Sequence, residues 1–262
     1  MNIIDSKIDG GKAFDWGRVS SDYAKYRDIY PTVFYEKIVD RSLCIKGQDV
    51  LDIGTGTGVI PRNMYKYGAT WTATDISENQ IEKAKELSTG MEISYFVSST
   101  ENIKLQADSF DVITACQCFW YFNHSITSPL LASLLKKGGR LLILYMAWLP
   151  LEDRIAGESE KLILKYNPLW TGANETRHPI SIPNEVLNNF EIVFHDEYDL
   201  QVPFTRDSWH GRMNACRGVG ASLSEEEIKS WENEHLALLN KIAPEKFNVL
   251  HYAAMTELKV RE

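Results

Sequence analysis

The stretch DVLDIGTGTG, residues Asp49 to Gly58, decides the fold. Its first five residues are a short apolar run of the kind that forms a buried strand, and the glycines that follow favour a tight turn. Val59 to Tyr67 can then form a helix. A strand, a glycine turn and a helix in this order bring backbone N–H groups and the positive end of a helix dipole to one point. The stretch therefore predicts a site for a pyrophosphate or for an amino-acid carboxylate.

Strand-like and helix-like segments alternate on both sides of this stretch. Apolar and β-branched runs predict strands over residues 49–53, 70–74, 91–98, 110–116, 140–146, 190–202 and 247–260. Helices are expected over residues 20–44, 59–67, 127–137 and 205–242, and from Ser77. Ser77 with Gln80 and Ser224 with Glu227 have the spacing of capping boxes. Strands that alternate with helices predict a doubly wound α/β fold.

The spacing of the glycines distinguishes between the two possible ligands. A dinucleotide fingerprint reads G-x-G-x-x-G, which would place glycine at position 59, where this chain has Val59. The third glycine is instead Gly58, and Asp52 stands two residues before Gly54. Asp75 follows the second predicted strand, where a carboxylate can accept both ribose hydroxyls of an adenosine. The pattern favours an adenosine joined to an amino acid over a dinucleotide.

Four segments together resemble the class I S-adenosylmethionine-dependent methyltransferases. LDIGTGTG resembles their first motif, Asp75 their ribose-binding acid, SFDVITACQCFWYF their fourth-strand segment and LLKKGGRLLILYM their fifth, in the family's order. The fourth segment is most similar to the branch of trans-aconitate methyltransferase-like proteins (methyltransferase type 11). The resemblance implies a doubly wound, mostly parallel seven-stranded Rossmann-like sheet with helical cap insertions and an antiparallel last strand. It also implies S-adenosyl-L-methionine as cofactor.

Two positions depart from the pattern of this branch. Trp120 stands where those proteins often have a histidine, so no role of that histidine is carried over. Ser99 occupies the place of an aspartate that often binds the adenine amino group, so adenine recognition would depend on Ser99 and on backbone groups around Thr100. The segment from Tyr23 through Tyr26 and Arg27 to Pro31 resembles an opening segment that closes over the cofactor. The predicted cofactor-binding residues are Tyr26, Arg27, Asp52, Gly54, Gly56, Gly58, Asp75, Ile76, Ser99, Thr100, Cys116 and Gln117.

The remaining segments suggest how the chain is organised around this core. We expect a mobile N-terminal arm within residues 1–17, and an arm and lid helix over 1–44. The cofactor-binding core would span 45–146, with cap insertions at 147–180 and 203–245 and the remaining core at 181–202 and 246–262. The insertions are rich in Trp and Arg, which supply apolar walls and bidentate partners for carboxylates. The predicted substrate-binding residues are Trp148, Trp170, Arg177, Trp209 and Arg212, with Arg217 a further candidate.

The catalytic residues are left open by the sequence. In a methyl transfer the cofactor carries the activated group, and the protein mainly positions and desolvates the reactants. A carboxylate acceptor needs no general base, whereas a phenol or amine often needs one, and a histidine would serve. His124, His178 and His210 are the candidates, while His195 and His251 fall in predicted outer strands and are expected to be structural.

Composition limits the partners and the location. The 262 residues carry a net charge of −8, which argues against nucleic-acid binding, because phosphate backbones require clustered Lys and Arg. We expect a cytoplasmic monomer or homodimer with free thiols, no bound metal and no membrane segment. The expected substrate is a small molecule, either a carboxylate or another acidic metabolite. The alternatives are a methyltransferase acting on a peptide or other macromolecule, a nicotinamide-dependent dehydrogenase and a non-catalytic cofactor-binding regulator.

Overall fold

The computed structural model describes residues 4, 6–15, 25–26 and 28–261. It contains seven strands: β1 (Asp49–Ile53), β2 (Thr70–Asp75), β3 (Ile93–Val97), β4 (Phe110–Cys116), β5 (Leu135–Trp148), β6 (Phe190–Thr205) and β7 (Lys246–Val260). The α-helices are α2 (Thr32–Asp40), α3 (Val59–Met64), α4 (Glu78–Leu87), α5 (His124–Leu134), α6 (Arg154–Tyr166), α7 (Asn184–Leu187), α8 (Arg206–Asn214) and α9 (Glu225–Ile242). Among the described residues, no helix is both long and apolar enough to cross a bilayer.

The strands form one sheet in the order β3-β2-β1-β4-β5-β7-β6. The pairs β1–β2, β1–β4, β2–β3 and β4–β5 are parallel. Placing β7 between β5 and β6 interrupts the parallel winding at that edge. The predicted seven-stranded, mostly parallel Rossmann-like sheet is therefore confirmed.

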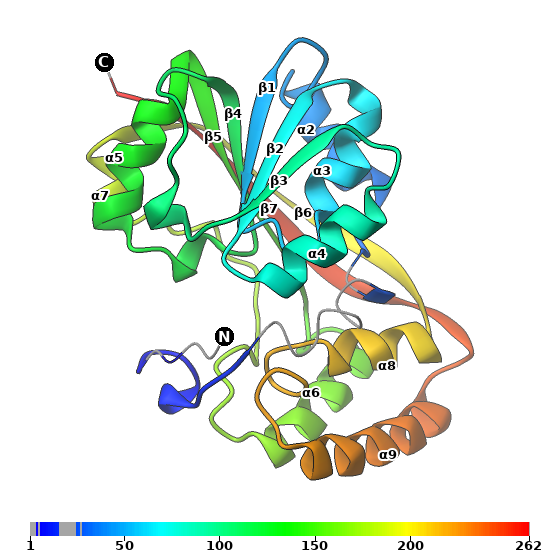
Figure 1. The fold of residues 1–262 in the computed structure, drawn as a ribbon. Coiled ribbons are helices and arrows are strands. Elements are labelled where there is room, and N and C mark those ends of the chain that lie inside the picture. The colour runs from blue at the N-terminus through cyan, green and yellow to red at the C-terminus, as the bar shows by residue number, and fades with distance from the viewer. Residues whose placement is uncertain (1–3, 5, 16–24, 27, 262) are drawn as a thin grey trace. The chain divides into compact units, whose positions relative to one another are not determined.

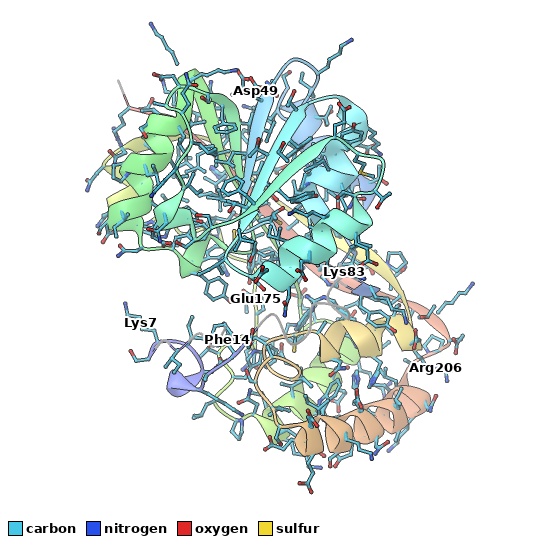
Figure 2. All side chains as sticks on the ribbon, in the orientation of Figure 1. Lys7, Phe14, Asp49, Lys83, Glu175 and Arg206 are labelled. Atoms are coloured by element: carbon cyan, nitrogen blue, oxygen red, sulfur yellow. The ribbon has the colours of Figure 1, made fainter. Side chains whose placement is uncertain are left out.

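The chain divides into two compact units. Unit 1 contains residues 1–29, 147–178 and 199–252, and unit 2 contains residues 30–146, 179–198 and 253–262. Strands β5, β6 and β7 contribute residues to both units. Within unit 2, helices α2, α3 and α4 cover one face of the sheet, and α5 and α7 cover the other (Figure 1). Figure 2 shows Asp49 at the end of unit 2 where β1 begins, and there Lys136 pairs with Asp49 and Asp111 at 2.8 Å each.

Several element boundaries differ from the sequence prediction. The helix expected over 20–44 is described as α2 from Thr32, because Pro31 disfavours helical backbone at the residue before it; residues 16–24 and 27 lie outside the described residues. The expected helix over 205–242 is two helices, separated by a turn-rich stretch with Gly218 and Gly220. The helix over 127–137 is instead α5 over 124–134, since residues 135–139 join β5 and Leu135 pairs with Phe110 across a β-bulge.

Two predictions of local hydrogen bonding had opposite outcomes. The capping box of Ser224 and Glu227 is present at the start of α9. Ser77 makes no side-chain cap, and its backbone N–H donates to the carboxylate of Asp75 at 2.9 Å, where a capping box would have it donate to Gln80. Within the predicted N-terminal arm, Phe14 is buried in unit 1, and the N–H of Asp15 donates to the Ala221 carbonyl at 3.0 Å. The mobility of the arm stays a prediction.

Candidate functional site

The glycine turn after β1 adopts backbone that disfavours other residues. Gly54, Gly56 and Gly58 have φ values of 62°, 56° and 74°, all in the left-handed region. A Cβ atom at Gly54 would lie 2.7 Å from the side chain of Cys118, and one at Gly58 would overlap the hydroxyl of Tyr95. Packing alone thus accounts for glycine at two of the three positions. The backbone conformation of Gly56 leaves its amide available to a neighbouring acid.

Asp75 is that acid. The parallel register, which pairs Ile53 with Thr74, brings the end of β2 beside the turn. One carboxylate oxygen of Asp75 accepts the N–H of Gly56 at 2.9 Å, and the other accepts the N–H of Ser77 at 2.9 Å. Burial raises the pKa of Asp75, while the backbone hydrogen bonds oppose that shift. The carboxylate is therefore held in one orientation at the carboxyl end of the sheet.

Asp52 lies behind the turn and supports it. Its two carboxylate oxygens accept the hydroxyls of Thr55 and Thr114, each at 2.5 Å. The side chain is buried, and burial raises its pKa to about 7. The structure thus shows Asp52 joining β1, the turn and β4. Its predicted contact with the cofactor stays a prediction.

The loops after β2 and β3 contain the residues predicted to surround the base. Ile76 follows Asp75, and 47% of its side chain is exposed. Ser99 precedes the short helix η4 (Thr100–Asn102), and its hydroxyl accepts a hydrogen bond from the side chain of Asn102 at 2.8 Å. Thr100 is buried. An exposed apolar residue beside Asp75 is what a flat base would pack on, whereas Ser99 already has a partner within its own loop.

Cys116 and Gln117 stand where β4 ends. Gln117 has a φ of 63°, and its side-chain amide donates to the carbonyl of Met146. Its backbone N–H donates to Leu144 at 3.0 Å, so Gln117 ties β4 to β5. The thiol of Cys116 donates to the hydroxyl of Tyr30 at 3.5 Å. A direct role of either residue in cofactor binding stays a prediction.

Of the opening segment, Tyr26 is described and Arg27 lies outside the described residues. Tyr26 packs on α8 within unit 1, because a Cβ atom at Gly211 would overlap its ring. The hydroxyl of Tyr26 lies 3.5 Å from the carboxylate of Asp207, on the same helix. Glycine at position 211 is therefore what allows Tyr26 to pack there.

The described residues fit a cofactor that contains an adenosine and an amino-acid group. The glycine turn has a backbone conformation that lets a ligand approach closely, and the carboxylate of Asp75 is oriented next to this turn. An acid at the end of the second strand suits ribose hydroxyls, and a helix N-terminus suits a carboxylate. The arrangement agrees with the geometry that the motif predicts.

The cap arginines differ in their surroundings. Arg177 is partly exposed and pairs with Asp199 at 2.7 and 2.8 Å and with Glu152. Arg217 pairs with buried Asp9 at 2.9 Å. Both therefore already bind carboxylates of the protein itself. Arg212 is only 5% exposed, and its guanidinium lies 4.8 Å from the centre of the Trp148 ring.

The three predicted substrate tryptophans are buried in unit 1. The indole N–H of Trp148 donates to Glu160 at 2.9 Å, and that of Trp209 donates to Ser159 at 3.0 Å. Trp170 packs so closely that a Cβ atom at Gly218 would lie 2.8 Å from its ring. All three contribute to the core of unit 1, so a contact with substrate would involve their ring faces or edges.

The three candidate histidines have different neighbours. His124 begins α5 in unit 2 and packs on Phe119 with 4.4 Å between ring centres, and partial burial lowers its pKa. In unit 1, His178 lies 2.8 Å from the carboxylate of Glu175, and His210 lies 2.9 Å from His235, nitrogen to nitrogen. Their catalytic roles stay predictions.

His251, which the sequence predicts to be structural, is a buried polar residue. It lies on β7, 1% exposed, among the rings of Trp148, Phe204 and Trp209. Burial lowers its pKa to about 3, and the charge of Arg212 acts in the same direction. The only sequence signal was its position near the start of the last strand.

Comparison with known proteins identifies the core. Residues 51–143 match a family described as a methyltransferase domain. The chain is 29% identical over 149 residues to a ubiquinone biosynthesis O-methyltransferase of Dechloromonas aromatica, covering 55% of the chain and 63% of the relative. It is 31% identical over 129 residues to a putative methyltransferase of Dictyostelium discoideum, covering 49% of the chain and 47% of the relative. The chain therefore spans about half to two thirds of these relatives' length.

Solved structures show the same fold at low sequence identity. YjhP from E. coli aligns with a TM-score of 0.54 and 17% identity over 93% of this chain and 100% of that one. A phosphoethanolamine N-methyltransferase of Haemonchus contortus, solved with phosphomonomethylethanolamine and S-adenosylhomocysteine, aligns with a TM-score of 0.54 and 16% identity over 93% of this chain and 58% of that one. Such likenesses establish the shared fold.

Proposed function

We propose, from the premise that this chain belongs to the class I methyltransferases through the domain at residues 51–143, that it transfers a methyl group from S-adenosylmethionine to a small molecule. The observation that carries the proposal is the pairing of Asp75 with the amide of Gly56 at the carboxyl ends of β1 and β2. That pairing fixes an acid beside a turn whose backbone favours glycine. An adenosine with an attached amino acid matches this pair of features.

The roles of the residues follow from the chemistry. S-adenosylmethionine, when bound, supplies an activated methyl group on a sulfonium. Asp75 would accept the ribose hydroxyls, and the amino-acid group would lie against the glycine turn, whose Gly56 amide is held by Asp75. Ile76 would pack against the base, and Ser99 and Thr100 would border it. In a direct displacement the main task of the protein is to position the cofactor and the acceptor.

The acceptor that we propose is a small, acidic molecule. The net charge of −8 disfavours nucleic acid, and a buried arginine, Arg212, lies in the unit that includes both insertions. One relative is named a ubiquinone biosynthesis O-methyltransferase, which supports a small-molecule acceptor over a macromolecule. A carboxylate acceptor would need no general base, so this proposal requires no catalytic histidine.

The test is methyl transfer by the whole chain. The protein is incubated with S-adenosylmethionine labelled in the methyl group and with a panel of small acids, neutral small molecules and peptides, and the products are separated by mass. We expect label in a small acidic molecule and in no peptide. Label only in peptides would establish the macromolecular alternative, and cofactor binding without any transfer would support a regulator. An Asp75→Ala variant is the control, since its weaker cofactor binding should lower the transfer of label when S-adenosylmethionine is below saturation.

A further inference from the structure

Two exposed aromatic side chains stand on the loop that follows β4 in unit 2. Trp120 is 39% exposed and Tyr121 is 40% exposed, and both belong to the short helix η5 (Phe119–Tyr121). Phe119 is only 1% exposed and anchors the loop, with its ring edge to face with that of Trp120 at 6.2 Å between centres. Exposed apolar residues that adjoin one another are more typical of binding surfaces than scattered ones. The roles assigned so far to the cofactor-binding residues leave both exposed rings unused.

The loop that carries Trp120 is held against the glycine turn. The thiol of Cys118 donates to the carbonyl of Ile53 at 3.1 Å. A Cβ atom at Gly54 would lie 2.7 Å from the side chain of Cys118 and 3.6 Å from the ring of Phe122. Residues on both sides of Trp120 in the sequence therefore contact the first glycine of the turn. All of them belong to unit 2, so the position of Trp120 near the turn is set within that unit.

A second ring from the neighbouring strand orients the indole. The ring centres of Trp120 and Tyr145 lie 5.1 Å apart, and the two ring planes are 79° apart. Tyr145 follows Leu144 on β5, and the parallel register pairs Leu144 with Cys116 at the end of β4. A nearly perpendicular contact is a favourable aromatic geometry and restricts the indole to one orientation. The indole thus stands at the carboxyl ends of β4 and β5, the edge at which open α/β sheets bind ligands.

The sheet order places Trp120 and Asp75 on opposite sides of the glycine turn. Strand β2, which ends in Asp75, and strand β4, which leads to Trp120, pair with opposite edges of β1. In the proposed function the ribose binds Asp75 and the amino-acid group lies against the turn. The sulfonium joins these two parts of the cofactor, so it would lie next to the turn. An acceptor that approaches the methyl group from the β4 side would then contact the loop of Trp120.

We infer that Trp120 is a specificity-determining residue of the acceptor site, and that its indole stacks on the planar ring of an aromatic acceptor. The inference rests on the proposed function and names the acceptor class for it. The indole is uncharged and offers a broad π surface, so it recognises a flat ring and not the acidic group of the acceptor. A saturated ring of similar size can bury a comparable area but lacks the stacking interaction, which corresponds to about 2- to 10-fold in affinity.

The experiment compares flat and saturated ligands of equal charge. Binding of benzoate and cyclohexanecarboxylate, and of 2-naphthoate and decahydro-2-naphthoate, is measured by calorimetry on the whole chain saturated with S-adenosylhomocysteine. We expect the flat member of at least one pair to bind about 2- to 10-fold more tightly. Trp120→Leu keeps an apolar side chain and should abolish the preference, whereas Trp120→Phe keeps a ring and should retain part of it. Tyr67→Leu is the matched control, because Tyr67 precedes β2 and lies at the amino ends of the strands, and it should keep the full preference.

A second measurement locates the ligand without depending on the stability of a variant. In protein labelled with 5-fluorotryptophan, benzoate should shift the fluorine NMR signal of Trp120 and leave those of buried Trp71 and Trp231 unchanged. The signal of Trp120 is identified as the one that is missing from Trp120→Phe.

Three results would overturn the inference. The first is no preference for the flat member of either pair in the parent, and the second is a preference that Trp120→Leu keeps. The third is binding of tetramethylammonium that depends on Trp120 in the absence of any preference for flat rings, because an indole face also attracts cations. Binding of S-adenosylhomocysteine is titrated first in the same samples. Its absence would contradict the proposed function, whereas its presence without the preference would contradict only this inference.

Discussion

Replacing Asp75 by alanine should weaken cofactor binding by a predictable amount. In the structure its carboxylate accepts the N–H groups of Gly56 and Ser77, each at 2.9 Å. Alanine removes these bonds and the expected bond to the ribose. A hydrogen bond to a charged group contributes about 1.5–3 kcal/mol, and the loss of one such bond to the ligand corresponds to a Kd about 10- to 150-fold higher.

The assay is calorimetry with S-adenosylhomocysteine on the parent, Asp75→Ala and Asp75→Asn proteins. Asparagine keeps one oxygen that can accept the Gly56 amide, so its Kd should fall between the other two. Thermal unfolding without ligand shows whether each variant is folded. An affinity within twofold of the parent in a folded Asp75→Ala protein would show that the acid does not face the ribose.

Three further predictions concern the turn, the cap and pH. Gly56→Val should abolish thermal stabilisation by S-adenosylhomocysteine, because a β-branched residue is strained at a φ of 56°; a shift as large as the parent's would contradict it. Gly211→Ala should displace Tyr26, visible as a change in tyrosine fluorescence or proteolysis of the N-terminal segment, and an unchanged pattern would show that the packing is unimportant. The pKa of His251 is lowered to about 3, so its folded form binds fewer protons than its unfolded form between pH 6.5 and 3, and its stability contribution falls as pH falls through that window. From pH 7 to pH 5 this amounts to about 2 kcal/mol, so His251→Phe should lose that much less stability in urea titrations, and equal losses would contradict it.

The sequence predicted the first half of the sheet well because each element there is decided locally. The apolar run at 49–53, the glycines after it and the acid ending the second strand each have a residue-level cause, and the structure confirms the strands and the order of elements. The predicted ends of helices and strands were wrong where pairing with a distant strand sets them. Residues 135–139 include two lysines and two glycines, yet they extend β5 because Leu135 pairs with Phe110.

The sequence also could not predict which residues surround the polar side chains, because tertiary packing decides these neighbours. Arg177, Arg212 and Arg217 look alike as residue types, but only the fold shows that Arg177 and Arg217 pair with carboxylates of the chain. His251 was expected to be structural because it falls in a strand, and no pattern reveals that three aromatic rings surround it. Its neighbours come from residues 148, 204 and 209, brought together by the ends of different strands and by α8.

Calorimetric titration of the unmodified chain with S-adenosylhomocysteine and, separately, with NAD distinguishes a methyltransferase cofactor site from a dinucleotide site. The glycine spacing, with Val59 where a dinucleotide site needs glycine, and the acid at position 75 predict one S-adenosylhomocysteine bound per chain. The same two features predict that titration with NAD releases no heat beyond the heat of dilution. Saturable binding of NAD with none of S-adenosylhomocysteine would contradict the central claim.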